Sequence, residues 1–284
     1  MAAVYMILTI LIVFRRWSYI EGSKRASIIA FLVVLVAVTS YQMIVPESLV
    51  SSLAVAINIL GIYVNMENPA KMELDRYHKE MVYGFANMIE VRDGSTGQHV
   101  KRTTKYVELI SSELRKKGYY PRVLTKDYRT NLSQAAPLHD VGKIMTPDAI
   151  LQKPGKLTNE EYDIMKLHTI NGAGLIQNCM KNLGEQQYIN MAYQVAMYHH
   201  EKWNGNGYPE GLSETQIPLC ARIMAVADVF DALVEKRCYK DEMTLDQGFE
   251  IIRKEAGESF DPAIVKVFLE AKEQVKEIHD SFSE

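Results

Sequence analysis

The stretch HDVGK, residues 139–143, follows an apolar segment and places a histidine directly before an aspartate. Neutral imidazole binds iron, manganese and zinc, and a carboxylate can bridge two ions, so His139 and Asp140 are candidate metal ligands. One such pair carries little information, because most adjacent His and Asp residues are ordinary polar side chains at a helix end. Its meaning depends on the other histidines.

Further histidines accumulate along the chain. His168 lies in a predicted helix, and His199 and His200 are adjacent after another one. His78 falls in a predicted linker helix and His279 in the charged C-terminal segment, so we expect both to be exposed and to have no catalytic role. Their exclusion makes the remaining cluster harder to attribute to chance.

Asp228 is a further candidate ligand. It falls in the apolar segment 221–234, where an unpaired buried carboxylate would be very costly. A metal would supply the partner that Asp228 needs. The alternative is an ion pair with Arg222 or Lys236.

The soluble part of the chain is predicted to be predominantly helical. Apolar residues recur at helical spacing, strand patterns are nearly absent, and the predicted fold class is all-α. The loops at 153–156 and 203–212 are rich in Gly, Pro and Asn, and a helical scaffold often carries its function on such loops. The predicted helices are Val100–Lys117, Thr130–Leu138, Thr158–Ile176 with a capping box, Gln186–Tyr198, Pro218–Val234, Leu245–Glu255 and Pro262–Glu277.

Composition excludes some classes of function. A net charge of −3 and a pI near 6.2 give no basic field, so we expect no polymeric nucleic acid as a partner. Cys179, Cys220 and Cys238 have no CxxC spacing, which argues against a disulfide framework and against a cysteine zinc site. We expect reduced and mostly buried thiols.

The N-terminal part is apolar enough to predict a membrane anchor. Residues 2–14, 26–45 and 49–65 form three candidate transmembrane segments. The alternatives are a signal peptide for the first and buried core helices for the others, but a signal peptide has its positive charges before the apolar run. The loop between the first two segments carries the positive charges, which predicts that it and the soluble part face the cytoplasm. These charges are Arg15, Arg16, Lys24 and Arg25.

We therefore divide the chain into a membrane anchor (1–67), a linker helix (68–92) and a soluble domain (93–284). Within the linker, apolar residues recur at helical spacing over 71–91. This pattern suits a coiled-coil homodimer, and it equally suits a helix that packs on its own domain.

Taken together, these motifs resemble the HD-GYP family, the bacterial HD-domain phosphohydrolases that degrade the second messenger cyclic di-GMP. The resemblance runs from about Glu90 to the C-terminus, and the segment RDGSTGQH, residues 92–99, adds His99 as a first histidine ligand. The motifs that carry it are His139-Asp140, Lys143, His168, the stretch HHEKWNGNGYPEGL at 199–212, IPLCARI at 217–223 and DVFDAL at 228–233.

The resemblance implies a two-metal site, with iron or manganese as the metals. Some members bind a third metal through a glutamate four residues before the first histidine, but Ser95 occupies that position, so we expect two ions. Such ions lower the pKa of a water and stabilise phosphoryl charge, which suits phosphodiester hydrolysis. The implied ligands are His99, His139, Asp140 and Asp228 for one metal and His168, His199 and His200 for the other, with Asp140 as the bridge.

Substrate contacts are implied for three cations and one loop. Lys143 matches the family lysine at the scissile phosphate, and Arg237 and Lys240 match cationic phosphate contacts. The loop Gly207-Tyr208-Pro209 borders the family's active site and is implicated in docking GGDEF-domain cyclases. The turn at 213–216 departs from the usual glycine-bearing turn, which alters a loop and no ligand.

The expected function is therefore a signalling phosphodiesterase at the bacterial inner membrane, with its catalytic domain in the cytoplasm and cyclic di-GMP cleaved to pGpG or GMP. One alternative is hydrolysis of another cyclic dinucleotide such as cyclic GMP-AMP. Another is a sensor that binds nucleotide or a cyclase without turnover, although the complete ligand set argues against it.

Overall fold

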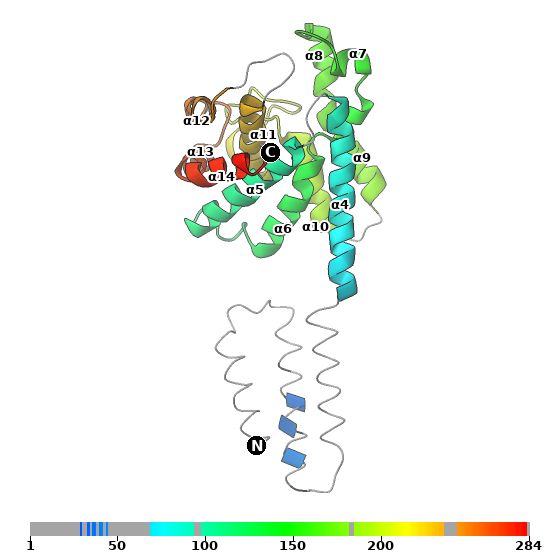
Figure 1. The fold of residues 1–284 in the computed structure, drawn as a ribbon, viewed down its shortest axis with the longest axis vertical. Coiled ribbons are helices and arrows are strands. Elements are labelled where there is room, and N and C mark those ends of the chain that lie inside the picture. Colours follow the sequence, from blue (N-terminus) through cyan, green and yellow to red (C-terminus); the bar gives the residue numbers. More distant parts are fainter. Residues whose placement is uncertain are drawn as a thin grey trace. The chain divides into compact units, whose positions relative to one another are not determined.

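The computed structural model describes residues 69–93, 98–181, 185–235 and 243–282, with isolated positions between Ile29 and Ile44 (Figure 1). Residues 1–78 and 79–284 form two compact units. Apart from those isolated positions, the three predicted transmembrane segments lie outside the described residues. In the described part of the chain, no helix has both the length and the apolar character needed to cross a bilayer.

The second unit is helical, as predicted. In the described ranges the extended pairing is limited to isolated bridges, such as that between Asn204 and Ser213. The elements are α4 (Pro69–Arg92), α5 (His99–Lys116), α6 (Lys126–Ala135), η2 (Ala136–Leu138), η3 (Val141–Met145), α7 (Asp148–Leu151), α8 (Asn159–Lys166), α9 (His168–Met180), α10 (Gln186–Tyr198), η4 (Glu214–Gln216), α11 (Leu219–Val234), α12 (Leu245–Lys254), α13 (Pro262–Glu270) and α14 (Lys272–Asp280).

Two helices that were predicted as continuous are broken. The predicted helix 158–176 changes direction at Leu167, and the predicted helix 262–277 breaks at the buried Ala271. Neither break contains Pro or Gly, so periodicity alone could not reveal it. The capping box predicted at the start of α8 is present, with Thr158 accepting from the Glu161 backbone N–H.

The predicted helix 130–138 also differs. It begins earlier, at Lys126, because the Thr125 hydroxyl accepts from the Tyr128 backbone N–H and caps the first turn. Its last three residues tighten into η2, where Pro137 lies at the start. The chain therefore reaches His139 through a short 3₁₀ turn.

The core forms where α5, α6, α10 and α11 pack on one another (Figure 1). Phe230 of α11 lies at its centre, with ring centroids 5.6 Å from Tyr106, 4.8 Å from Phe249 and 5.0 Å from Phe268. All four rings are fully buried. This apolar packing fixes α5 against α11, the two helices that carry His99 and Asp228.

The cysteines agree with the prediction in part. Cys179 and Cys220 are free thiols, and Cys220 is buried as expected. Cys179 is exposed, so the expectation of a buried thiol is wrong there, because that residue lies near the end of α9, on its solvent side. Cys238 lies outside the described residues.

Candidate metal centre

The structure brings all seven predicted ligand side chains together in the second unit. They lie at helix ends, except for one on the middle of α11, and all are buried except the half-buried His200. They are His99 at the start of α5, His139 and Asp140 between η2 and η3, His168 at the start of α9, His199 and His200 after α10, and Asp228 on α11.

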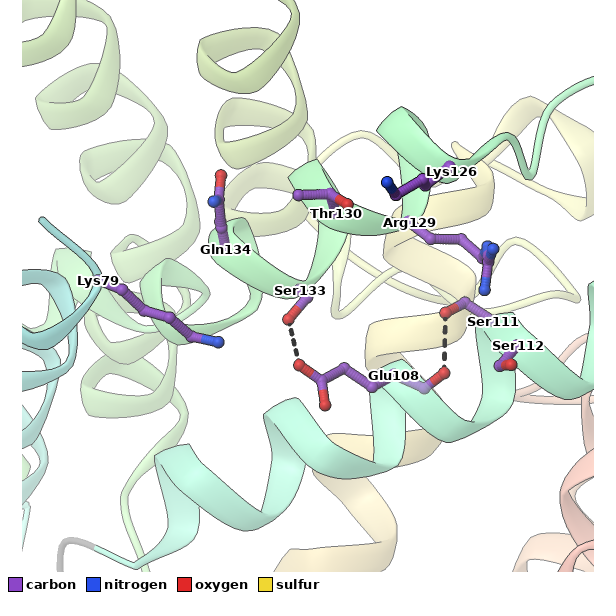
Figure 2. Close-up of a pocket in the computed structure, with 9 residues that line it drawn as sticks. All are labelled: Lys79, Glu108, Ser111, Ser112, Lys126, Arg129, Thr130, Ser133 and Gln134. Atoms are coloured by element: carbon purple, nitrogen blue, oxygen red, sulfur yellow. Dashed lines mark hydrogen bonds between the residues drawn. The ribbon is translucent and has the colours of Figure 1, made fainter. Parts of the chain in front are cut away.

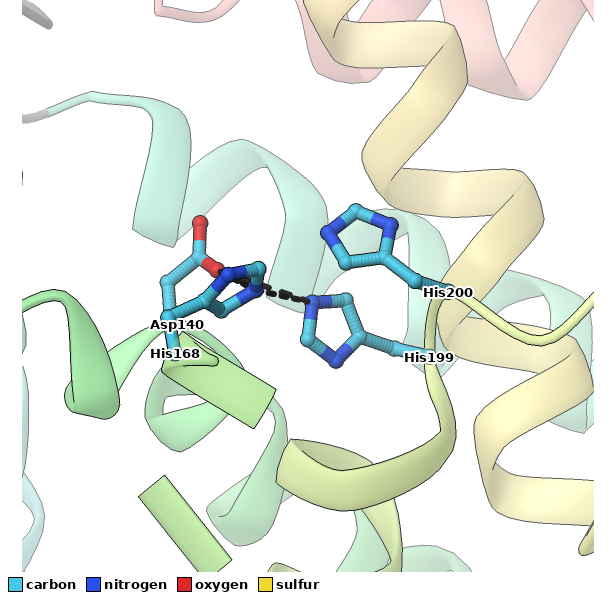
Figure 3. A group of neighbouring side chains, drawn as sticks. All are labelled: Asp140, His168, His199 and His200. Atoms are coloured by element: carbon cyan, nitrogen blue, oxygen red, sulfur yellow. Dashed lines mark hydrogen bonds and ion pairs between the residues drawn. The ribbon is translucent and has the colours of Figure 1, made fainter. Parts of the chain in front are cut away.

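Asp140 lies between two groups of imidazoles. Its Oδ1 is 3.2 Å from His168 Nε2 and 3.5 Å from His199 Nε2, whereas its Oδ2 is 3.4 Å from His139 Nε2. Figure 3 shows this carboxylate facing the three imidazoles of one group, from His168, His199 and His200. The arrangement is that of a carboxylate that can bridge two ions.

The second group lies on the other side of Asp140. Asp228 Oδ1 is 3.4 Å from His99 Nε2 and 3.7 Å from His139 Nε2. We call His99, His139 and Asp228 the carboxylate-rich half of the centre, because the carboxylate of Glu90 also approaches its two rings. We call His168, His199 and His200 the imidazole half.

Unsatisfied atoms at the centre test whether it fits a metal. His139 Nε2 and Asp140 Oδ1 are buried and have no hydrogen-bond partner among the described residues. Buried polar atoms are nearly always paired, so each of these two atoms indicates a missing partner. Asp140 and the imidazole half each offer one ligand atom within 4.8 Å of the others, which fits a divalent cation.

The ion pair considered for Asp228 does not form with Arg222. The Arg222 guanidinium instead lies 2.6 Å from Asp261 and donates to the Ile217 carbonyl at 2.9 Å. Lys236 lies outside the described residues. Asp228 is therefore directed at imidazoles and not at Arg222.

Hydrogen bonds at Nδ1 set the orientation of the imidazoles. An Nδ1 that donates to a carbonyl or carboxylate leaves the Nε2 lone pair for a metal. Four of the rings follow this rule, which directs their Nε2 atoms into the centre. The acceptors are Asp231 for His99 (2.8 Å), Ala136 O for His139 (2.9 Å), Met165 O for His168 (2.7 Å) and Val195 O for His199 (3.0 Å).

Asp231 is a functional residue to which sequence reasoning assigned no role. Arg102 holds it from behind, with Nε 2.7 Å from Oδ1 and Nη2 2.8 Å from Oδ2. Burial alone would raise the pKa of Asp231, but His99 and Arg102 hold it below its usual value. A charged Asp231 therefore orients His99, one turn of α11 after Asp228.

The two halves differ in electrostatics. In the carboxylate-rich half, burial opposes protonation, yet Asp228 and Asp231 raise the pKa of His99 well above its usual value, and Asp140 raises that of His139. In the imidazole half, burial lowers the pKa of His199, and burial together with the neighbouring rings holds that of His200 well below the usual range. One half therefore attracts positive charge more strongly.

Gly142, the glycine of the HDVGK stretch, lies where η3 approaches α9 closely. A Cβ at Gly142 would lie 1.9 Å from the His168 carbonyl oxygen and 2.4 Å from the Gly172 nitrogen. Only glycine lets η3 approach the start of α9 this closely. The approach places Asp140 beside His168.

Lys143 lies at the bridging carboxylate. Its Nζ is 2.7 Å from Asp140 Oδ2 and 2.5 Å from Asp93 Oδ2. Although burial opposes the charge, Asp140 and the carboxylates of α4 and its end raise the pKa of Lys143 well above its usual value. Sequence reasoning missed Asp93 and Glu90 as neighbours of Lys143, although both lie in or beside the segment that resembles the family.

The Gly207-Tyr208-Pro209 loop reaches the imidazole half. The Tyr208 ring lies over His200, with centroids 4.9 Å apart and planes 31° apart. A Cβ on Gly207 would lie 2.2 Å from the Lys202 nitrogen, so glycine is required there. The buried Glu201 carboxylate closes the loop by accepting from three backbone N–H groups, of Glu210, Gly211 and Leu212. The loop is thus built in place beside the centre.

Three other predicted positions lie outside the described residues: Arg237, Lys240 and Ser95. A separate polar cavity of about 520 Å³ lies between α5 and α6 (Figure 2). Ser133 donates to Glu108 at 2.5 Å on its wall, and Lys79 and Arg129 also line it. None of the candidate metal ligands lines this cavity, so it is no part of the centre.

Comparisons with known proteins agree with this geometry. The HD domain family model matches residues 85–264. A cyclic di-GMP phosphodiesterase of Vibrio cholerae serotype O1 is 41% identical over 203 residues, which cover 72% of this chain and 41% of that protein. A 3'3'-cGAMP-specific phosphodiesterase of the same organism is 39% identical over 215 residues, covering 75% of this chain and 39% of that protein.

This chain thus spans less than half the length of these two curated relatives. A crystal structure of a V. cholerae cyclic GMP-AMP specific phosphodiesterase shares the fold, with a TM-score of 0.51 and 18% identity over 71% of this chain and 53% of that one. The chain therefore belongs to the HD domain family, and its curated relatives support a place in the HD-GYP branch.

Proposed function

We propose that this protein is a metal-dependent phosphodiesterase that hydrolyses cyclic di-GMP to pGpG or onward to GMP. One observation carries the proposal: the two oxygens of Asp140 face two different sets of imidazoles. The names of the 41% identical relatives support cyclic di-GMP as the substrate.

The donor set suits two divalent ions, iron or manganese, because it combines imidazoles with carboxylates and contains no thiolate. When bound, such ions acidify a water and neutralise charge on phosphoryl oxygens. We assign one ion to His99, His139, Asp140 and Asp228, and the other to Asp140, His168, His199 and His200.

Lys143 supplies a fixed positive charge. Because its pKa is raised, it stays protonated at neutral pH and serves as a cation, not as a general base. We assign to its Nζ the stabilisation of negative charge on the scissile phosphate, where charge-assisted hydrogen bonds are strong. Arg237 and Lys240 are assigned to the other phosphate, and Tyr208 to the wall of the substrate site beside His200.

Cyclic GMP-AMP is the second candidate substrate. The hydrolytic groups act on phosphate and not on the bases, and a 39% identical relative is named for that substrate. Chromatographic time courses with each dinucleotide, on the full chain reconstituted with Mn²⁺ under reducing conditions, would separate the two. Faster hydrolysis of cyclic GMP-AMP would replace the primary proposal, and turnover of neither would favour a non-catalytic sensor.

We also propose that residues 1–67 form a membrane anchor, residues 68–92 a linker and residues 93–284 the phosphohydrolase domain. In this proposal the domain lies in the cytoplasm at the bacterial inner membrane.

α4 exposes an apolar stripe at helical spacing, which supports a homodimer through this helix. Light scattering of the detergent-purified chain should show a dimer, and Phe85→Glu should weaken it. The stripe consists of Leu74, Tyr77, Met81, Phe85, Met88 and Val91. Docking of GGDEF-domain cyclases at the 207–209 loop remains a proposal from the family.

A further inference from the structure

Glu90 is a buried acid that the function above does not use. It lies in the last turn of α4 and is 2% exposed. Its Oε1 is buried without a hydrogen-bond partner among the described residues. A carboxylate oxygen removed from water in this way is costly unless a cation or donor compensates it.

The nearest side-chain cation is engaged elsewhere. Lys143 Nζ is 3.8 Å from Glu90 Oε1, beyond hydrogen-bond distance, whereas it is 2.5 Å from Asp93 and 2.7 Å from Asp140. Lys143 therefore lowers the cost of the Glu90 charge without satisfying the oxygen. A closer partner is still needed.

Two imidazoles complete the surroundings of Glu90. One ligand atom from each of Glu90, His99 and His139 lies within 4.8 Å of the other two. His139 Nε2 is itself buried without a hydrogen-bond partner in the described part of the chain. Glu90 on α4 and His139 after η2 thus belong to one cluster of possible ligands, and each has an unsatisfied atom.

We infer that Glu90 is a further ligand of the metal held by the carboxylate-rich half. A hard divalent ion such as Mn²⁺ or Fe²⁺ accepts carboxylate oxygen together with imidazole nitrogen, and it would satisfy both orphaned atoms at once. The inference rests on the proposed metal-dependent function and adds a ligand to it. It stands apart from the position of Ser95, where the family's additional glutamate would fall.

The consequence is that the linker helix itself enters the metal centre. Arg92, two residues after Glu90, donates to the Ile144 carbonyl at 3.2 Å and pairs with Asp148 at 2.7 Å. These contacts hold the end of α4 against η3 and α7. A rotation of α4 would withdraw a metal ligand directly, so the helix has a physical route to change metal binding.

The test uses Glu90→Gln, which keeps the size of the side chain and removes its charge. Mn²⁺ binding to the metal-free full chain is measured by calorimetry, and metal content after anaerobic reconstitution by mass spectrometry, both without substrate. We expect the affinity of one of the two binding events to fall by at least about tenfold, with the other unchanged. Glu80→Gln, an exposed acid on the same helix, is the matched control and should bind like the parent.

A second comparison separates a ligand from a mere neighbour of Lys143. If Glu90 only positions Lys143, then Glu90→Gln should have no further effect in a Lys143→Met background. If Glu90 is a ligand, the loss of affinity should be the same in both backgrounds. Glu90→Asp, which keeps the charge on a shorter side chain, should bind with intermediate affinity.

Unchanged Mn²⁺ affinity and content in a folded Glu90→Gln protein would overturn the inference. So would an effect that disappears in the Lys143→Met background. A chain that binds Mn²⁺ through Glu90 and fails to hydrolyse cyclic di-GMP would instead overturn the proposed function, so the two failures are distinguishable.

Discussion

The two halves of the metal centre are each suited to bind a metal ion, but they do so with different side chains. The imidazole half consists of histidines alone, and hydrogen bonds from His168 and His199 to backbone carbonyls fix its geometry. The carboxylate-rich half adds the carboxylate of Asp228 to its two rings, and a side-chain network orients one of these rings: Asp231 accepts from His99, and Arg102 donates to Asp231. His139 is oriented by the Ala136 carbonyl, so within the carboxylate-rich half it is His99 that depends on a chain of charged side chains.

A difference in ion affinity should follow. Opposite charges attract more strongly at a buried site than in water, so the half with the added carboxylates of Asp228 and Glu90 should hold a divalent ion more tightly. The imidazole half should release its ion first.

Asp140 is the one side chain shared by the two halves, so its loss should have the largest effect. We expect Asp140→Ala to abolish binding of both ions and to lower cyclic di-GMP hydrolysis by roughly 10³-fold or more. Metal analysis and chromatography measure the two losses. Asp163→Ala, at an exposed position on α8, is the control and should behave like the parent. Retention of both ions by Asp140→Ala would contradict the assignment of the bridge.

Asp231→Asn should lower metal affinity in the carboxylate-rich half alone. It leaves the ligands in place but weakens the hydrogen bond that orients His99, and outer partners of this kind are worth about 10–100-fold in metal affinity. Calorimetry with Mn²⁺ should show the loss in one binding event only. Arg102→Lys, which keeps the charge and loses the two-pronged contact, should give a smaller loss. An equal loss in both binding events would break the comparison.

Gly142→Ala should act on the imidazole half through packing. The added methyl group meets the His168 carbonyl at 1.9 Å, so η3 must move away from α9. We expect a loss of about 1–3 kcal/mol in the free energy of unfolding. The metal ion in the imidazole half should also bind more weakly. Thermal or denaturant unfolding provides the measurement.

The matched control is Gly174→Ala, further along α9, where an added methyl group meets nothing within 4 Å. That change should stabilise the helix by about 0.5–1 kcal/mol. If both glycine variants lost the same stability, close packing at Gly142 would not be the cause.

Tyr208 should have the smallest effect, because it touches the imidazole half only from the rim. Tyr208→Ala removes the ring that lies over His200. The lost ring-to-ring contact should cost about 0.5–1.5 kcal/mol of interaction free energy. Tyr208→Phe keeps the stacked ring and should bind Mn²⁺ like the parent. A large loss of metal affinity in Tyr208→Phe would show that the hydroxyl has a role at the centre itself.

Much of the fold could be predicted because the residue pattern of a helix is local in the sequence. Periodicity placed α10 at its observed bounds, and the spacing of Thr158 and Glu161 located the start of α8. The breaks at Leu167 and Ala271 could not be predicted, because neither has a local breaker. At Leu167 the new direction lets the start of α9 pack on η3.

The candidate site also contains residues that the sequence could identify and residues that it could not. The seven ligand candidates lie in short motifs that can be recognised one at a time, and the structure brings them together. The roles of Glu90 and Asp231 arise from packing between distant segments: Asp231 meets His99 across 132 positions of sequence. A single sequence without homologues contains no local signal for such a pair.

Two ions joined by Asp140 should be required for hydrolysis. The most direct test is a titration of the metal-free full chain with Mn²⁺, in which cyclic di-GMP hydrolysis and bound metal are measured on the same samples. We expect little activity at one ion per chain and a maximum near about two ions per chain. Full hydrolysis at one ion per chain, or without metal, would contradict it.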